Sequence, residues 1–345
     1  MRISDFEYDL PEELIAQHPL ERRDASRMLV LDRSKQTWRD STFTAFPDYL
    51  APSDLLVINN TRVFPARLSG ERYPSGGRVE VLLVREIDSE TWEALIRPGQ
   101  RLKTGAKLQF GNGRLKAELL DSPGHSVRLI RFHSIEQFQQ LLGELGQTPL
   151  PPYIKRPEGD SPNDRERYQT VFAHEEGAIA APTAGLHFTP EILQRVRARG
   201  TRIVEITLHV GYGTFEPVRV ENVEEHRVAA EAFAISAKTA KEINAARTRG
   251  GRILAVGTTT ARALESAVTD DGPLPAIKST ANLTITPGYN FRIVNGLLTN
   301  FHLPRSSLLL LVSAFAGREL VLETYRHAVA NRYRFYSYGD CMLIL

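Results

Sequence analysis

The sequence predicts an α/β protein in which a helix-covered sheet domain carries an inserted small antiparallel β-barrel domain. Two stretches with different sequence patterns indicate this fold. Between residues 78 and 132, short β-rich runs are bounded by Ser-Gly-Gly, Pro-Gly-Gln, Gly-Asn-Gly and Ser-Pro-Gly turns, which is typical of a small barrel or sandwich. Beyond residue 168, strand and helix signals alternate, which favours a sheet covered by helices.

The order of the elements suggests that the barrel is an insertion. A short buried-strand signal at residues 55–58 ends at Asn59-Asn60-Thr61 and precedes the barrel-like region. The string Pro149-Leu150-Pro151-Pro152 must be extended and marks a boundary. We therefore expect a discontinuous α/β domain of residues 1–64 and 151–345, with residues 65–150 inserted as the barrel. Two sequential domains are the alternative.

The later helices and strands have clear start and stop signals. Thr189-Pro190-Glu191 supplies an N-cap, an N1 proline and an acidic first turn for a helix that ends at Gly200. A strand is expected at residues 202–210, and a second helix runs from the Ser236 cap to about residue 249. A buried strand at residues 253–256 then leads into a third helix.

Composition excludes several classes of protein. A formal net charge of +2 argues against a strongly basic nucleic-acid tail, although a local basic face remains possible. The single cysteine, Cys341, excludes an internal disulfide and a Cys-rich zinc site, which fits a reducing cytosol. The first ten residues resemble no signal peptide, and the longest apolar stretch, residues 308–316, is shorter than the ~20 residues of a membrane span. We expect a soluble cytoplasmic protein.

The last fifth of the chain interleaves amide, imidazole, guanidinium and carboxylate groups with aromatic rings. The strings are Pro-Gly-Tyr-Asn-Phe from Pro287, Leu-Thr-Asn-Phe-His-Leu-Pro from Leu298, and Tyr-Arg-Phe-Tyr-Ser-Tyr-Gly-Asp from Tyr333. An ordinary structural tail buries its aromatic residues singly. This interleaving is what a pocket for a flat polar ligand requires.

A strand that ends at Gly257-Thr258-Thr259-Thr260 presents N–H and hydroxyl groups at a helix start, as an anion site does. The string is neither a Walker loop nor G-x-G-x-x-G, and a plain threonine N-cap is the alternative interpretation. His187 follows Gly185 in a loop where the backbone can approach a ligand, but a lone histidine is often a structural hydrogen-bonding residue. The string from His209 to Phe215 can equally be a strand-end turn with an aromatic plug.

Other catalytic classes lack their motifs. The nine histidines contain no metal-binding spacing such as His-x-x-x-His, and no G-x-S-x-G elbow is present. The residues alone therefore indicate an α/β enzyme that binds a small anionic or nucleotide-like ligand.

Many short strings, in this order and over nearly the whole chain, resemble one family. It is the S-adenosylmethionine:tRNA ribosyltransferase-isomerase family of queuosine biosynthesis (the QueA family). The strings are Asp5-Phe6, residues 14–19, 23–27, 59–63, 65–68, 149–154, 167–171, 180–189, 209–215, 257–266, 287–288 and 299–304.

The chain departs from the family pattern at a few positions. The element that begins at His226 normally carries a second histidine three residues later, where this chain has Ala229, although Glu231 is kept. Asn295 stands where an aspartate is usual, and Thr284-Ile285 replaces a Phe-Ile pair. Roles that need the missing imidazole or carboxylate are not transferred.

The resemblance implies the reaction. The ribosyl part of S-adenosylmethionine would be transferred to 7-aminomethyl-7-deazaguanine at the tRNA wobble position and isomerised, giving epoxyqueuosine with release of adenine and methionine. The sulfonium acidifies C5′, so that a base can form an ylide that expels adenine; the amine then attacks, and epoxide closure releases methionine. This chemistry needs a base, an acid and a pocket that excludes water, but no cofactor or metal.

For the reaction that the resemblance implies, we assign site residues by residue type and position. Gly257, Thr258 and Thr259 would bind the methionine carboxylate, and His187 and His302 are the candidates for proton transfer. Asp340 would balance the sulfonium or read the modified base, and Tyr289 and Phe291 would stack on adenine or deazaguanine. Arg62 and Arg67 would hold tRNA phosphate. The remaining expected substrate-binding residues are Thr183, Gly185, His209, Gly211, Glu231, Arg262 and Asn300.

The implied partners are S-adenosylmethionine, consumed as a co-substrate, and tRNA that carries the modified base, with no membrane; a monomer is expected. Two alternatives remain. One is a nucleotide-binding α/β oxidoreductase, which the missing dinucleotide fingerprint disfavours. The other is a non-catalytic tRNA-binding protein of the same fold, which would not release adenine and methionine.

Overall fold

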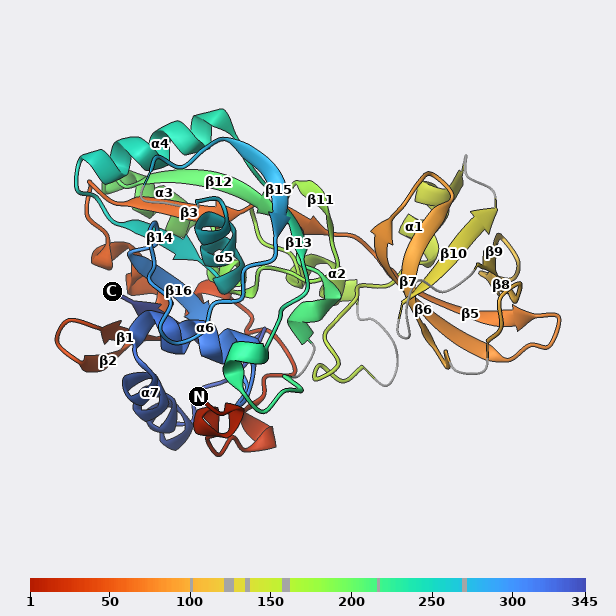
Figure 1. The fold of residues 1–345 in the computed structure, drawn as a ribbon, viewed down its shortest axis with the longest axis horizontal. Coiled ribbons are helices and arrows are strands. Elements are labelled where there is room, and N and C mark those ends of the chain that lie inside the picture. Colours follow the sequence, from red (N-terminus) through yellow and green to blue (C-terminus); the bar gives the residue numbers. More distant parts are fainter. Residues whose placement is uncertain (100–101, 121–126, 134–136, 157–161, 216–217, 269–271) are drawn as a thin grey trace. The chain divides into compact units, whose positions relative to one another are not determined.

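The computed structural model describes residues 1–99, 102–120, 127–133, 137–156, 162–215, 218–268 and 272–345. These residues form two compact units (Figure 1). The sheet unit contains Met1–Arg62, Pro151–Lys155 and Gln169–Leu345, and the barrel unit contains Val63–Leu150 and Arg156–Tyr168. We propose that the domain boundaries lie at residues 64 and 150, as expected from the sequence.

The sheet unit is built on one nine-stranded mixed sheet. In spatial order its strands are β15 (Ile277–Ala281), β13 (Glu231–Ile235), β12 (Arg202–Leu208), β3 (Leu55–Asn59), β14 (Ile253–Val256), β16 (Gly296–Asn300), β17 (Cys341–Ile344), β1 (Arg27–Asp32) and β2 (Thr37–Thr42). A separate two-stranded sheet joins β4 (Thr61–Val63) to β11 (Glu175–Ala178). Strands β3, β14, β16 and β17 are buried along their whole length, which is the pattern of strands covered on both faces.

Strands β12, β3, β14 and β16 are neighbours and run parallel. Their carboxyl ends therefore meet at one edge, which we call the carboxyl edge. Strand β17 is antiparallel to β16, so its first residue, Cys341, lies opposite Asn300 at the same edge. In sheets of this kind ligands bind beyond the carboxyl ends of the strands.

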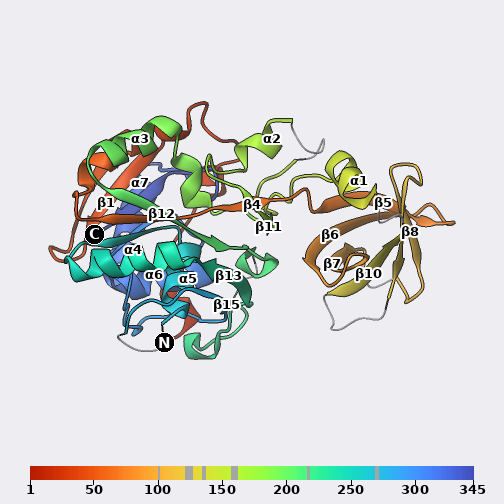
Figure 2. The same ribbon diagram turned by 90° about the horizontal axis from the view of Figure 1, so that it is seen from above.

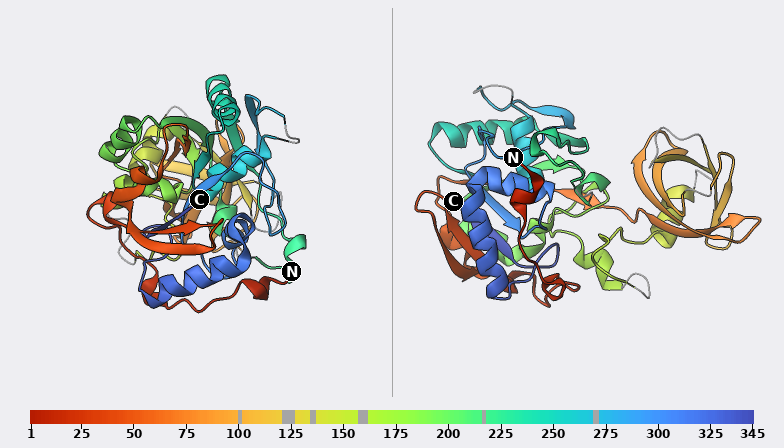
Figure 3. Two further views of the ribbon diagram at one scale, coloured as in Figure 1. Left: turned by 90° about the vertical axis from the view of Figure 1, so that its left-hand side faces the viewer. Right: turned by 60° about the horizontal axis from the view of Figure 1, so that its bottom comes forward.

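Helices cover both faces of the sheet because its strands alternate apolar side chains between two cores. Leu55 and Val57 belong to the core under α4 (Ala237–Thr248), α5 (Thr258–Ser266), α6 (Ser307–Ala316) and α7 (Arg318–Ala330). Leu56 and Ile58 belong to the core under α3 (Pro190–Ala198) and the 3₁₀ helices η4 (Phe43–Tyr49) and η6 (Thr183–His187). Figure 2 shows α3 and α4 on opposite sides of β12, and Figure 3 shows the same layers from the side.

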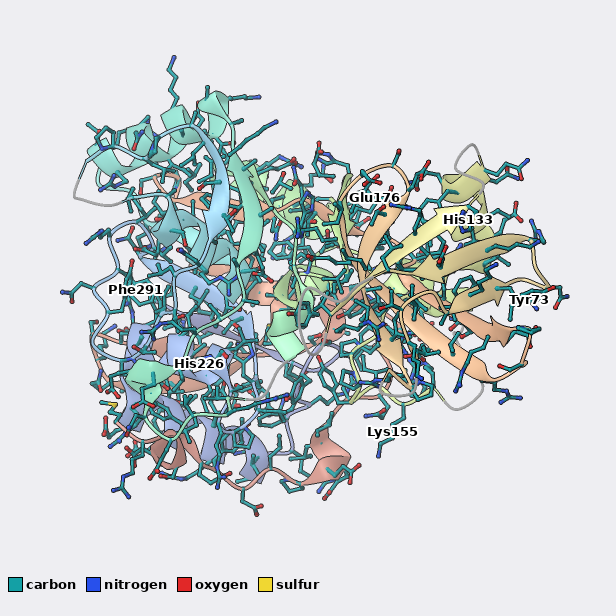
Figure 4. The ribbon with its side chains drawn as sticks, turned by 45° about the vertical axis from the view of Figure 1, so that its right-hand side comes forward. Tyr73, His133, Lys155, Glu176, His226 and Phe291 are labelled. Carbon is teal, nitrogen blue, oxygen red and sulfur yellow. The ribbon has the colours of Figure 1, made fainter. Side chains whose placement is uncertain are left out.

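The barrel unit is a closed six-stranded antiparallel barrel. Its strands, in spatial order, are β10 (Arg128–His133), β7 (Thr91–Arg97), β6 (Arg78–Glu86), β5 (Arg67–Tyr73), β8 (Lys107–Phe110) and β9 (Leu115–Leu119). Helices α1 (Phe138–Leu145) and α2 (Pro162–Arg167) complete the unit. Alternate residues of β6, such as Val79, Val81 and Leu83, fill the interior. Tyr73, labelled in Figure 4, ends β5 with 58% of its surface exposed.

The predicted fold class is confirmed, because a helix-covered sheet and an inserted antiparallel barrel are both present. The sequence did not predict β5, whose Arg-Leu-Ser-Gly-Glu-Arg-Tyr composition is polar. Among the described residues, no helix combines the length and the apolar character that crossing a membrane would require.

Candidate active site

The carboxyl edge collects most of the predicted site residues. His209 and Gly211 follow β12, Gly257 follows β14, and Asn300 is the last residue of β16. Asp340 immediately precedes β17 at the same edge. Two groups of polar side chains can be distinguished there, one around the start of α5 and one around His187.

The turn between β14 and α5 depends on glycine. Gly257 has φ of +92°, a left-handed conformation that glycine adopts without strain, and it caps α5 without a side-chain hydrogen bond. The N–H groups of the first turn of α5 are therefore not satisfied by a cap, and the helix end carries partial positive charge. The hydroxyl of Thr260 donates to the carbonyl of Val256 over 2.6 Å, whereas the buried Oγ1 of Thr259 has no hydrogen-bond partner among the described residues.

A buried ion pair lies beside this turn. The Oε1 atom of Glu231 accepts a 2.7 Å hydrogen bond from the N–H of Gly211, and Oε2 accepts from the guanidinium of Arg262. The two charged side chains are only 3% and 12% exposed. The Nε of Arg262 is buried and, within the described parts of the chain, unpartnered. Gly211, Glu231, Gly257, Thr258, Thr259 and Arg262 are called the α5 cluster below.

The α5 cluster borders a cavity of about 30 Å³, which has room for about two water molecules at most. Its lining includes the polar residues Thr258, Thr259 and Arg262 and the apolar residues Leu283, Ile285, Leu308 and Leu311. Gly213, Val228, Thr284 and Ser307 complete the lining. Ser307 also contacts the Nε2 of His226 over 2.7 Å; His226 is labelled in Figure 4. The cavity thus offers both polar and apolar contacts to one ligand.

The second group centres on His187, which is 3% exposed. Its Nδ1 lies 2.9 Å from Ser26 Oγ, and its Nε2 lies 3.3 Å from the Nδ2 of Asn300. The same Nδ2 donates to the carbonyl of Tyr336 over 3.0 Å, so the amide nitrogen of Asn300 faces His187, and Nε2 is the acceptor. Nδ1 then carries the proton and donates to Ser26. We call His187, Asn300, Ser26 and Arg334 the His187 cluster.

Burial, assisted by the charges of Arg23 and Arg334, lowers the pKa of His187 to about 3. The imidazole is therefore neutral near pH 7. It can accept a proton, as a weak base, but it cannot donate one as an imidazolium ion. Before substrate binds, His187 can therefore act only as a weak base and not as a general acid.

His302 lies apart from this group. Its Nε2 is 2.8 Å from the hydroxyl of Thr299, its N–H donates to Tyr325 over 3.1 Å, and its carbonyl accepts from Tyr8. Adjacent residues of a strand point to opposite faces, so Thr299 with His302 and Asn300 with His187 lie on different faces of β16. Burial lowers the pKa of His302 to about 3 as well. The structure does not bring the two candidate catalytic histidines together.

The 3₁₀ helix η6 connects the two groups. Thr183 begins it, and a Cβ at Gly185 would lie 2.7 Å from Thr170 Cγ2 and 2.9 Å from Phe172 Cζ, so packing excludes any side chain there. A Cβ at Gly257 would lie 3.9 Å from the Cβ of Ala184, within η6. The α5 cluster and the His187 cluster are therefore neighbours.

His209 and Asp340 are held by local hydrogen bonds. The Nδ1 of His209 lies 2.8 Å from the Thr61 hydroxyl, and burial lowers its pKa. The carboxylate of Asp340 accepts from the N–H of Arg27 over 2.9 Å and from the N–H of Arg334 over 2.8 Å. Burial raises the pKa of Asp340. Both of its oxygens are engaged in joining β1 to the turn before β17.

Tyr289 and Phe291 lie at the other edge of the sheet. They precede β16, and the Tyr289 hydroxyl donates over 3.1 Å to Glu265, near the end of α5. Seven residues of α-helix separate this contact from Thr258, or about 10 Å. The ring of Phe291 packs edge-on against Phe315 at 4.8 Å. The structure does not bring these rings to the other predicted site residues.

The two arginines predicted to bind tRNA differ in their surroundings. Arg62 is exposed. Arg67 lies in the barrel unit, where its Nη2 donates to the carbonyl of Leu150 over 2.9 Å and its Nη1 lies 3.8 Å from Glu80.

Two departures from the family pattern have local explanations. The amide oxygen of Asn295 accepts from the N–H of Ile253 over 3.0 Å at the amino ends of β14 and β16, away from the carboxyl edge. An amide performs this task as a carboxylate would. Thr284 borders the α5 cavity and accepts from the N–H of Val228 over 3.1 Å.

Sequence reasoning missed Ser26, Arg334 and Ser307 as site residues. Ser26 and Arg334 lie within strings that had been singled out, but 161 residues separate Ser26 from His187. No spacing rule connects residues so far apart. Nor, within the described ranges, do three or more His, Cys, Asp or Glu side chains gather where they could hold a metal ion.

The fold and the two clusters are those expected of an α/β enzyme, with a candidate polar ligand site at the carboxyl edge of its sheet. The family model described as "Queuosine biosynthesis protein" matches residues 3–344. The S-adenosylmethionine:tRNA ribosyltransferase-isomerases of Symbiobacterium thermophilum and Desulforamulus reducens are 50% and 48% identical over 345 residues, covering 100% of both chains in each case. The crystal structure of S-adenosylmethionine tRNA ribosyltransferase from Thermotoga maritima is 37% identical, with a TM-score of 0.56 over 99% of this chain and 100% of that one.

This chain belongs to the S-adenosylmethionine:tRNA ribosyltransferase-isomerase family of queuosine biosynthesis. The resemblance inferred from the short strings is confirmed, and with it the class of enzyme.

Proposed function

We propose that this protein transfers the ribosyl group of S-adenosylmethionine to 7-aminomethyl-7-deazaguanine at the tRNA wobble position and isomerises it. Epoxyqueuosine in tRNA is the product, and adenine and methionine are released. The relatives' names supply the two substrates. The observation that carries the proposal is the α5 cluster. There the buried Thr259 Oγ1 and Arg262 Nε have no partner within the part of the chain that the structure describes, and both residues line a cavity that also has apolar residues in its lining.

The α5 cluster suits the amino-acid part of S-adenosylmethionine. A carboxylate is stabilised by the uncapped N–H groups and partial positive charge at the start of α5. The hydroxyl of Thr259 and the Nε of Arg262 are donors without partners among the described residues, so they can complete its coordination. The methylene groups would then pack on the leucine and isoleucine side chains that line the cavity. Because the cavity is only about 30 Å³, side chains must move to admit the ligand.

The His187 cluster supplies the proton acceptor in our proposal. Base removal of a proton from C5′, next to the sulfonium, forms an ylide that expels adenine; amine attack and epoxide closure then release methionine. His187 is neutral near pH 7, shares a face of β16 with Asn300, and adjoins the α5 cluster through η6. We prefer it to His302, which lies on the other face of β16, away from Asn300.

We also propose that Arg62 and Arg67 bind tRNA phosphate. Salt-dependent contacts of this kind need only a local basic surface, which a net charge of +2 permits. Both substrates are cytoplasmic molecules, so we place the protein in the cytoplasm, where we expect a monomer.

The test is turnover with S-adenosylmethionine and tRNA that carries 7-aminomethyl-7-deazaguanine. Adenine and methionine should appear in equal amounts, and the tRNA mass should rise accordingly. S-adenosylhomocysteine is the matched control, because it lacks the sulfonium that acidifies C5′ and should release no adenine. Binding of both substrates without any release of adenine would instead indicate the non-catalytic tRNA-binding alternative.

A further inference from the structure

Two buried polar atoms of the His187 cluster have no hydrogen-bond partner among the described residues. They are the Oδ1 of Asn300, an acceptor, and the Nη1 of Arg334, a donor. A buried polar atom without a partner destabilises the folded state, so native proteins keep few of them. Asn300 is only 2% exposed, and it ends β16 at the carboxyl edge, where ligands of such sheets bind.

Other polar atoms of these two side chains hold them in place. The Nδ2 of Asn300 donates to the carbonyl of Tyr336 and faces His187, which fixes the amide and leaves Oδ1 as its unused end. The Nη2 of Arg334 donates to the carbonyl of His18, which holds the guanidinium in place. The Tyr336 carbonyl that Asn300 binds is two residues along the chain from Arg334, and the charge of Arg334 also acts on the imidazole of His187. The His187 cluster thus contains one fixed donor, the Nη1 of Arg334, and one fixed acceptor, the Oδ1 of Asn300.

The chemistry of this pair excludes a simple anion. A phosphate or carboxylate would be attracted by Arg334, but its oxygens would be repelled by the Oδ1 of Asn300. The pair instead matches a ligand edge that presents one acceptor next to one donor. Purine-like bases carry such an edge, and arginine and asparagine are the side chains that commonly read it.

We propose that Asn300 and Arg334 bind the hydrogen-bonding edge of a purine-like base, and that this base is the deazaguanine of the tRNA. Arg334 Nη1 donates to O6 of the base, and Asn300 Oδ1 accepts from its N1–H. A carbonyl oxygen is the stronger partner for a charged donor, which favours deazaguanine over adenine. The proposal rests on the proposed function, because that function supplies the base. Adenine of S-adenosylmethionine offers the same kind of edge, and the experiment separates the two sources.

The experiment measures binding rather than turnover. An anticodon stem-loop RNA with 7-aminomethyl-7-deazaguanine at the wobble position is compared with the same RNA carrying an abasic site there. The parent protein should bind the first RNA at least about tenfold more tightly, as expected for a charged hydrogen bond. In Arg334→Met and Asn300→Ala this preference should shrink about tenfold, with affinity for the abasic RNA unchanged. A folding defect would weaken both RNAs equally, so the preference itself reports the contact.

Arg27→Met is the matched control. The guanidinium of Arg27 lies 3.6 Å above the Tyr333 ring and donates to the carbonyl of Asn331 over 2.7 Å, so its loss should leave the base preference at the parental value. Binding of S-adenosylmethionine is the second arm. If Arg334→Met and Asn300→Ala weaken it about tenfold and keep the RNA preference, the pair binds adenine, and the assignment to tRNA is overturned. If folded variants alter neither quantity, the pair binds no base.

Different results would contradict the base site and the proposed reaction. A parent protein that prefers the base-bearing RNA but releases no adenine would contradict the reaction and keep the base site. A parent protein that releases adenine and shows unchanged base preference in both variants would contradict the base site and keep the reaction.

Discussion

The amide of Asn300 faces the imidazole of His187 across 3.3 Å, between Nδ2 and Nε2. His302, two residues further along the chain, is instead bound to the hydroxyl of Thr299 on the other face of β16. The alternation of side chains along one strand thus separates two histidines that are candidates for the same proton transfer.

The two histidines should therefore respond differently to substitution. His187→Gln keeps a hydrogen-bonding side chain but cannot accept a proton near neutral pH, and turnover should fall by about 10²–10⁴-fold. His302→Gln should keep turnover near the parental value and lower the free energy of unfolding, because its partner Thr299 is buried. Single-turnover release of adenine checks the first result, and urea unfolding checks the second. The reverse pattern would assign the proton transfer to His302.

Thr259 and Thr260 form a matched pair at the start of α5. Thr259→Ala removes a buried hydroxyl that lacks a partner among the described residues, so the folded protein should lose no stability. S-adenosylmethionine binding should weaken by about 1–3 kcal/mol, since a hydrogen bond to a carboxylate is lost. Thr260→Ala removes a hydrogen bond to Val256 and should slightly lower stability with unchanged affinity. Calorimetry and thermal melting measure both quantities; equal affinities in the two variants would contradict the carboxylate assignment.

The Glu231–Arg262 pair should show strong coupling. Glu231→Gln leaves the buried guanidinium of Arg262 without its counter-charge, which is expected to cost about 3–5 kcal/mol of unfolding free energy. Glu231→Gln with Arg262→Met removes both charges and should recover part of that loss. A double-mutant cycle by urea unfolding measures the coupling. Additive losses would mean that the two side chains do not stabilise each other in solution.

Acid should destabilise the protein through its buried histidines. The pKa of His302 falls from 6.5 in the unfolded chain to about 3 in the folded protein. The depressed value means that its contribution to stability is present above pH 6.5 and is lost as the pH falls toward 3, because only the unfolded chain takes up the proton. The slope for one such group is at most about 1.4 kcal/mol per pH unit.

Urea unfolding between about pH 4.5 and 6.5 tests this for His302, since carboxylates of ordinary pKa titrate mostly below that window. His302→Gln should show a shallower dependence than the parent. The raised pKa of Asp340 acts with the opposite sign but is common to both proteins, so it cancels in the comparison. Identical slopes would mean that His302 is protonated in the folded protein.

The arginines predicted to bind phosphate are tested by salt. Arg62→Ala should lower tRNA affinity and reduce the slope of log affinity against log salt by about 1, with S-adenosylmethionine binding unchanged. Arg67→Ala should do the same and, in addition, lower the stability of the barrel unit, because Arg67 donates to Leu150. Parental slopes in both variants would place the tRNA contacts elsewhere.

Local sequence patterns were enough to predict several of the strands, turns and helices. The strand at β14, the glycine turn before α5 and the N-capped helices α3 and α4 were all predicted, because capping, proline and glycine preferences act over a few residues. The change in sequence pattern predicted a small barrel and a helix-covered sheet, and the order of the elements favoured an insertion over two sequential domains. Strand β5, by contrast, has a polar composition, and only its pairing with β6 and β8 makes it a strand.

Tertiary structure alone decided which polar groups act together. Nothing local places Ser26 beside His187 or Glu231 beside Arg262, because these contacts arise where distant strands end at one edge of the sheet. The sequence by itself placed Asn300 and His302 in one string where polar groups and aromatic rings are interleaved. Which face of the sheet each one occupies, and so which of them meets His187, depended on the register of β16 between its neighbours β14 and β17.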